Sequence, residues 1–384
     1  MSEKLNGLVL ALVTTTVCIA ASEVLLRFFV PQNTFSRMLE NTPAMFRKSD
    51  LLAYELVPLS KGKLVREEFD TTITINSEGY RGRRFNADKQ GRFRILAIGD
   101  SFTFGYGVED GESYPSRLEQ ILGNDYHMEN IEIINAGFAA GYSPDTYYLF
   151  LKERGLTLQP DLILIGFFIG NDIDHRNAFE HHWVKTDHEG LPLQIVNVEG
   201  QVEDSRWVRK HRQLVYRLPV LRNSHLFQLL VAAGKGVKRI LQGEETRLAD
   251  SMNPFMYEGT YQERTEAAVR QTQTLFRAMV GLAAKAGIPL VVLMIPAREQ
   301  VYPDKRPSVG NRDRDWEKPQ RIFSAFFERE RVPYLDLLPY LKSRTKETDF
   351  YFRYDMHWNA KGHEVGARIV AAYLVENHFF RGFR

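Results

Sequence analysis

The stretch RILAIGDSFTFGYG, residues 94–107, begins with a nearly continuous apolar run and ends in a glycine-rich turn. Such a run is typical of a β-strand that is covered on both faces. Similar runs follow at residues 131–136, 161–168, 289–295 and 332–338, and helical patterns lie between strands at residues 114–122, 145–154, 261–286 and 318–331. This alternation predicts an α/β fold with a parallel sheet and helices on both faces. In such sheets, chemically active side chains lie at the carboxyl ends of the strands.

The rest of the chain divides into three further segments. Residues 1–30 are predicted to form a membrane anchor, because the 17 residues from Leu5 to Ala21 carry no charge and the apolar pattern continues to Pro31. A cleaved signal peptide is the alternative. Residues 31–93 are predicted to form a β-rich extension, and residues 94–384 the main domain, with a mostly helical insertion at about 175–260.

Charge and cysteine content narrow the class of protein. A net charge of +2 argues against a nucleic-acid binder, and the single cysteine, Cys18, excludes an intrachain disulfide and a cysteine-based zinc site. Between Ser205 and Gly243 the insertion holds nine Lys or Arg residues and no acidic residue. This segment is a solvated basic surface or, alternatively, a lid or membrane-surface element that meets anionic lipid or an acidic polymer.

Polar or glycine residues follow three of the predicted strands. Ser101, in GDSFTFGYG (99–107), lies at a strand-to-helix turn that exposes a hydroxyl and gathers backbone N–H groups. Gly137, in NAGFAAGY (135–142), allows close approach of a backbone N–H to a ligand. Asn171, in GFFIGND (166–172), offers a side-chain amide donor. The three positions predict one nucleophile and two donors at the same sheet edge, which suits acyl transfer.

The segment DMHWNAKGH, residues 355–363, supplies the base that a nucleophilic serine needs. Asp355 and His357 are two residues apart, so in an extended loop their side chains project to the same side. Asn359 is expected to cap the last helix, which leaves both residues in the loop before it. A metal site formed by Asp355, His357 and His363 is the alternative, although His363 is expected to fall inside the helix and to pack there.

A second alternative is a carbohydrate-binding protein with an inactive hydrolase fold. Aromatic side chains around the predicted site could stack on sugar rings: Phe102, Phe104, Tyr106, Phe138 and Tyr142. Each of these is more often a core residue than a ligand contact. A complete set of serine, histidine and aspartate argues against an inactive scaffold, because no structural need brings the three together at strand ends.

Four separated blocks resemble the SGNH, or GDSL-type, serine hydrolases. Ser101 in GDSFTFG, Gly137 in NAG, Asn171 in GND and His357 in the last block match the four named residues of that family, in the same order. The resemblance covers about residues 94–375 apart from the insertion. It implies a flavodoxin-like three-layer α/β/α sandwich and a serine esterase that needs no cofactor or metal.

The resemblance also implies roles for the site residues. Ser101 would be the nucleophile, His357 the base and Asp355 its orienting acid. The oxyanion donors would be the backbone N–H groups of Ser101 and Gly137 and the side chain of Asn171. The expected substrate is an acyl ester, with an acetyl group on a carbohydrate as one candidate.

The last block departs from the usual Asp-x-x-His spacing of the family, because here the order is Asp355-Met356-His357-Trp358. This DxHW form resembles a membrane-associated branch that includes O-acetyltransferases of bacterial exopolysaccharides, so transfer to a polysaccharide is the alternative to hydrolysis. The anchor followed by INSEGYRG (75–82) also resembles bacterial membrane-anchored members, which implies a single-pass protein of the bacterial inner membrane with its catalytic domain in the periplasm. Basic residues near the two anchor ends, Lys4 against Arg27 and Arg37, weakly favour the opposite orientation.

Overall fold

The computed structural model describes residues 2–32, 45–52, 54–85, 88–138, 142–173, 182–197, 218–242, 254–306 and 314–381. Residues 205–217 of the basic segment of the insertion lie outside the described residues, as do the insertion histidines before His182.

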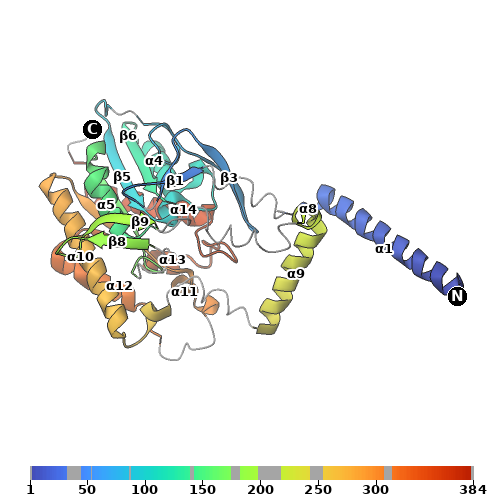
Figure 1. Cartoon of the computed structure of the whole chain (residues 1–384). Coiled ribbons are helices and arrows are strands. Elements are labelled where there is room, and N and C mark those ends of the chain that lie inside the picture. Colours follow the sequence, from blue (N-terminus) through green and yellow to red (C-terminus); the bar gives the residue numbers. More distant parts are fainter. Residues whose placement is uncertain are drawn as a thin grey trace.

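A five-stranded parallel sheet forms the centre of the α/β body (Figure 1). Its strands are β5 (Phe93–Gly99), β6 (Ile131–Gly137), β7 (Leu162–Phe168), β10 (Leu290–Ile295) and β11 (Tyr334–Asp336). They stand side by side in the order β6–β5–β7–β10–β11. Counted along the chain, this is the order 2-1-3-4-5 of flavodoxin-like sheets, which confirms the predicted fold class.

Helices cover both faces of the sheet. The longer helices of this body are α4 (Tyr114–Asn124), α5 (Pro144–Glu153), α10 (Glu263–Lys285), α12 (Lys318–Glu330) and α14 (Ala360–Glu376). Helices α4 and α14 pack together on one side, whereas α5, α10 and α12 form the other layer, into which β7 projects Phe167 against Phe276 and Phe323. Every residue of β5, β7 and β10 is buried, as their apolar sequences predict.

Shorter elements complete the body. They are α3 (Ser101–Phe104), η2 (Asp110–Glu112), η3 (Gly155–Leu158), η5 (Pro254–Tyr257), α11 (Arg298–Val301), η6 (Pro303–Lys305) and α13 (Leu338–Lys342). Two of them, α3 and α11, directly follow the sheet strands β5 and β10. Both therefore start at the sheet edge at which the carboxyl ends of the strands meet.

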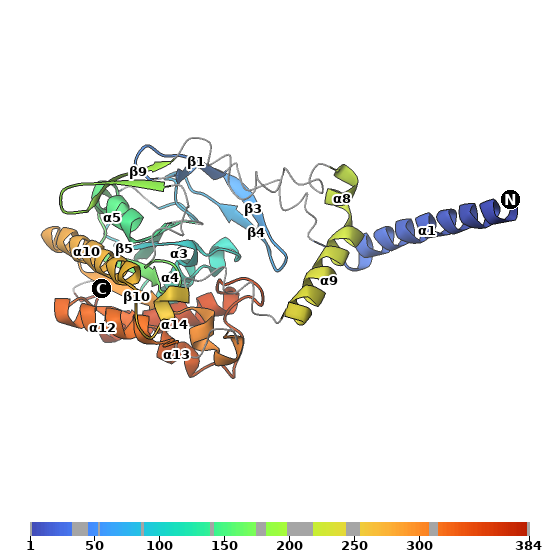
Figure 2. The same cartoon turned by 60° about the horizontal axis from the view of Figure 1, so that its bottom comes forward.

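The extension contains four short strands in two antiparallel pairs, namely β1 (Phe46–Lys48) with β2 (Tyr54–Leu56) and β3 (Lys61–Val65) with β4 (Asp70–Thr74). It packs on the body, because Arg81 forms bridges to Ile75 of the extension and to Asn135 of β6. Figure 2 shows the β3–β4 hairpin reaching along one end of the α/β body.

The described part of the insertion has more helix than strand, and it also contains a strand hairpin that the sequence analysis did not predict. Strands β8 (His182–Thr186) and β9 (Pro192–Asn197) form a hairpin, followed later by α8 (Pro219–Asn223) and α9 (His225–Gln242). The hairpin turn is stabilised by Asp187, whose carboxylate accepts the Glu189 and Leu191 N–H groups. Gly190 in this turn has a φ of 79°, a conformation that glycine adopts readily.

The N-terminal helix α1 (Ser2–Phe29) extends away from the α/β body (Figures 1 and 2). Its segment Lys4–Phe29 is long and apolar enough to cross a membrane, although a signal sequence would meet the same criterion. Near its end, the Glu23 carboxylate accepts hydrogen bonds from the Ser224 hydroxyl and from the His225 and Leu226 N–H groups, at 2.8, 3.0 and 2.9 Å. Glu23 therefore caps α9 and joins the insertion to the end of α1.

Candidate active site

Ser101 occupies the first position of α3, immediately after the central strand β5. The N-cap residue Asp100 accepts the Phe102 N–H with its carboxylate, and Gly105 ends the helix with a φ of 89°. Gly99 must be a glycine, because a Cβ there would lie 2.0 Å from the Thr103 hydroxyl oxygen. The tight turn thus places the serine at the carboxyl end of the strand, as the sequence predicts.

The structure brings His357 and Asp355 to Ser101. The His357 Nε2 atom lies 2.7 Å from the Ser101 Oγ, and the His357 Nδ1 atom hydrogen-bonds the Asp355 carboxylate. The same carboxylate accepts the His357 backbone N–H at 3.0 Å, which fixes the two residues relative to each other. Asn359 caps α14 by accepting the Lys361 and Gly362 N–H groups, so Asp355 and His357 lie in the preceding loop.

The surroundings favour an ionised Asp355 beside the histidine ring. Burial alone would raise the pKa of Asp355, but the His357 ring and the hydrogen bonds from His357 hold this pKa below its usual range. Phe102 and Tyr106 pack against the imidazole, with ring centroids 5.2 and 4.6 Å away. The side chains of His357 and Asp355 are 13% and 27% exposed, so neither is fully covered by the surrounding residues.

Asn171 lies in the turn after β7 with its side-chain oxygen buried and without a hydrogen-bond partner among the described residues. Its amide interacts with the Asp100 carboxyl, whose pKa burial raises to about 6. The neighbouring Asp172 accepts the Tyr147 hydroxyl and the Phe168 N–H, the latter at 2.9 Å, and so holds the turn. An amide side chain therefore stands next to the residue that precedes Ser101.

Gly137 ends β6, beside α3. Its N–H donates to the Asn135 side chain at 3.0 Å, so this group is already engaged. A Cβ at Gly137 would lie 2.1 Å from the Phe104 backbone nitrogen. The glycine is therefore required by the close packing of α3 on β6, and its role as an oxyanion donor stays a prediction.

His363 is fully buried in α14, as expected, where its Nδ1 accepts the Tyr114 N–H at 3.2 Å. Burial lowers the pKa of His363 to about 3, so its ring is neutral near pH 7. Four of the five aromatic residues considered for sugar stacking are also core residues with at most 4% exposure, namely Phe102, Phe104, Phe138 and Tyr142. Tyr106 alone is partly exposed among the five.

One family model matches part of the chain. Residues 255–383, which include the Asp355–His357 loop, match the family model described as an SGNH hydrolase-like domain of the acetyltransferase AlgX. These residues are similar to an SGNH hydrolase-like domain. The match supports an acyl esterase or an O-acetyltransferase as the activity. No curated protein matches the sequence.

Solved structures of esterases show distant likenesses to this chain. The acetyl xylan esterase AlAXEase is 14% identical with a TM-score of 0.39, and 74% of this chain and 99% of that chain are covered. The esterase EstA from Pseudoalteromonas sp. is 13% identical with a TM-score of 0.38, over 74% and 98% of the two chains. A variant of the acetyl-xylooligosaccharide esterase Axe2 from Geobacillus is 15% identical with a TM-score of 0.39, over 75% and 95%.

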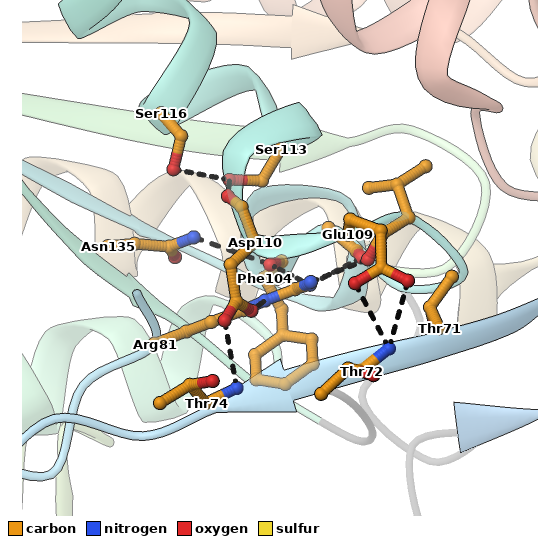
Figure 3. Close-up of polar contacts among 12 residues, drawn as sticks. Thr71, Thr72, Thr74, Arg81, Phe104, Glu109, Asp110, Ser113, Ser116 and Asn135 are labelled. Carbon is orange, nitrogen blue, oxygen red and sulfur yellow. Dashed lines mark hydrogen bonds and ion pairs between the residues drawn. The ribbon is translucent and has the colours of Figure 1, made fainter. Parts of the chain in front are cut away.

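Arg81, from the extension, holds the turn that follows α3 (Figure 3). Its side chain is 1% exposed, and its guanidinium donates to the carbonyl oxygens of Phe104, Gly105 and Val108. Its Nε atom pairs with Asp110 at 2.9 Å. Sequence reasoning missed this residue, because one arginine in a turn gives no signal of a partner more than twenty positions away.

Figure 3 also shows how the same turn is tied to β4. The Glu109 carboxylate accepts the Thr72 N–H with both oxygens at 3.1 Å, and the Asp110 carboxylate accepts the Thr74 N–H at 3.0 Å. The β-rich extension therefore supports the α3 turn that presents Ser101.

Proposed function

We propose that the protein is a serine esterase that cleaves an acyl ester through Ser101, His357 and Asp355. The 2.7 Å contact between Ser101 Oγ and His357 Nε2, with Asp355 on the other ring nitrogen, is the observation that supports it most. In the first step His357 takes the Ser101 proton while Oγ bonds to the acyl carbon. The alcohol leaves with the proton from His357, and Ser101 stays acylated.

A second acceptor then completes the reaction. Water, activated by His357, attacks the acyl carbon, the Ser101–acyl bond breaks and the serine regains its proton. The oxyanion formed in each step would be stabilised by the Ser101 N–H, which has no acceptor within α3, and by the Asn171 amide. Loss of one such donor typically raises the barrier by about 2.7–4 kcal/mol. The acyl group is proposed to be an acetyl group, on a carbohydrate.

Labelling with a fluorophosphonate probe tests the nucleophile. We expect the full-length protein in detergent to form an adduct at Ser101, found by mass spectrometry, and to hydrolyse p-nitrophenyl acetate. Ser101→Ala and His357→Ala should neither form the adduct nor hydrolyse the ester, and their circular dichroism spectra should match that of the wild type. An adduct at another serine, or unchanged hydrolysis by Ser101→Ala, would disprove the proposal.

An O-acetyltransferase is the second candidate, because the description of the matching family model names the acetyltransferase AlgX. In that case a sugar hydroxyl takes the place of water as acceptor. Acetylated donor and an oligosaccharide acceptor should then yield acetylated oligosaccharide faster than free acetate. Acetate release that is unaffected by any sugar acceptor would favour the esterase.

The membrane location is part of the same proposal. Helix α1 is proposed to stay uncleaved and to anchor the protein in a bacterial inner membrane with the SGNH hydrolase-like domain on the periplasmic side. The length and apolar composition of Lys4–Phe29 support the anchor, and the resemblance to membrane-associated O-acetyltransferases supports the side.

A further inference from the structure

The loop that carries the proposed acid and base is held by a residue of the distant extension. Glu68 accepts three consecutive backbone N–H groups of this loop. Its Oε1 accepts the Arg353 N–H at 2.7 Å, and its Oε2 accepts the Tyr354 and Asp355 N–H groups, both at 2.9 Å. Three successive N–H groups that converge on one carboxylate form a backbone anion site.

Glu68 lies at the tip of the β3–β4 hairpin, in the turn closed by the Arg66 N–H and the Phe69 carbonyl at 2.8 Å. The adjacent Phe69 packs against Tyr106 and Phe352, with ring centroids 5.5 and 5.1 Å away. Tyr106 in turn packs on the His357 imidazole. The hairpin tip is thus seated beside the proposed site by apolar contacts as well as by the carboxylate.

The carbonyl groups of the same loop are held from a second direction. Arg298, in the turn after β10, donates from its Nη1 atom to the Phe352 and Arg353 carbonyl oxygens at 3.2 and 2.6 Å. Its side chain is 6% exposed. A buried cation therefore binds the carbonyls while Glu68 binds the N–H groups, and the two charges complement the two sets of backbone dipoles.

We infer that Glu68 is a positioning residue for Asp355 and, through it, for His357. This inference rests on the proposed function. The third N–H that Glu68 accepts belongs to Asp355 itself, so the hydrogen bond fixes the backbone of the residue whose carboxylate orients the histidine ring. Without Glu68 the three N–H groups lose their acceptor, and the loop is free to move the Asp355 carboxylate away from His357.

Three single-residue variants of the full-length protein test this inference. Glu68→Ala should lower kcat for p-nitrophenyl acetate by about 10- to 100-fold with little change in KM, because small displacements of catalytic groups cost this much. Glu68→Gln keeps one acceptor oxygen and should lie between wild type and Glu68→Ala. Glu67→Ala is the matched control: it removes the same charge from an exposed neighbour on the same turn and should keep the wild-type kcat.

A double-mutant cycle separates positioning from a general loss of stability. If Glu68 acts through Asp355, Glu68→Ala should change kcat less than about twofold in an Asp355→Asn background. Multiplicative effects of the two substitutions, or a Glu68→Ala enzyme with wild-type kcat, would overturn the inference while leaving the esterase proposal intact. Hydrogen exchange at the amides of residues 353–355 gives a readout that does not depend on catalysis.

The amides of residues 353–355 should be protected from hydrogen exchange in the wild type and in Glu67→Ala. They should exchange faster in Glu68→Ala. Equal exchange in all three proteins would overturn the inference whatever the activity. If the wild type showed protection but no reaction with esters or fluorophosphonate, the loop contact would stand and the proposed function would fail.

Discussion

At the scale of single residues, His363 makes the stability of the fold depend on pH. Its pKa falls from 6.5 to about 3 on folding, because burial disfavours the charged ring. Between these values the unfolded chain binds a proton that the folded protein does not. The free energy of unfolding therefore falls as the pH is lowered from about 6.5, by up to about 1.4 kcal/mol per pH unit.

Comparison with His363→Asn isolates this contribution. Asparagine can still accept the Tyr114 N–H but does not titrate. We expect its free energy of unfolding, from urea denaturation, to fall less than that of the wild type between pH 7 and pH 5. The comparison is needed because Asp100 acts in the opposite direction. Its pKa is raised to about 6, so below that pH the folded protein binds a proton there, which partly offsets the decrease in the free energy of unfolding caused by His363. If the free energy of unfolding changed with pH equally in the two proteins, His363 would not be the source of the pH dependence.

At the scale of elements, the α3 turn depends on Arg81 of the extension. Arg81→Ala would leave three buried carbonyl groups and Asp110 without their cation, so we expect the free energy of unfolding to fall by about 3–5 kcal/mol. Arg81→Lys should recover only part of this loss, because one ammonium group cannot reproduce the planar fork of a guanidinium.

Arg83→Ala is the control for this prediction. Arg83 is two positions away, its side chain is 66% exposed, and it pairs with Glu119 at the surface. Its removal should change the free energy of unfolding by less than about 1 kcal/mol. Urea denaturation of the three variants measures both effects, and a loss below 1 kcal/mol for Arg81→Ala would mean that the turn holds without its cation.

The elements differ in how well the sequence predicts them. The five apolar runs and the helices between them were predictable, because burial on both faces leaves a strong local signal, and each predicted strand is confirmed. The β8–β9 hairpin of the insertion was missed because a short, partly exposed hairpin leaves a weak pattern. Neighbours in the sheet do not follow from periodicity, and the strand order came from the resemblance alone.

The residues of the candidate site also differ in how well the sequence predicts them. Ser101, Asn171 and the Asp355–His357 pair follow local signals, because each stands at the end of a strand or before a helix cap. Arg81 and Glu68 could not be found in this way, since their partners lie 23 to 29 and 285 to 287 positions away. The extension, predicted as a link to the anchor, is in fact packed against both the α3 turn and the Asp355 loop.

At the scale of the whole molecule, the proposed orientation can be tested with cysteine labelling. Cys18 is the single native cysteine, so Glu189→Cys in a Cys18→Ser background carries one thiol, in an exposed turn of the β8–β9 hairpin. A membrane-impermeant maleimide should label it in right-side-out inner-membrane vesicles. Inverted vesicles should be labelled only after detergent is added. The reverse pattern would place the SGNH hydrolase-like domain in the cytoplasm.

The contact between Glu68 and residues 353–355 also bears on the order of events during synthesis. The hairpin tip leaves the ribosome long before its partner loop, and Ser101 precedes His357 by 256 positions. At about 5–20 residues per second, the early segments wait many seconds for the residues that complete the site. A nascent chain therefore lacks the base that is proposed to activate Ser101 until translation has passed residue 357. On the proposed function, chains that stop before this residue would not cleave esters.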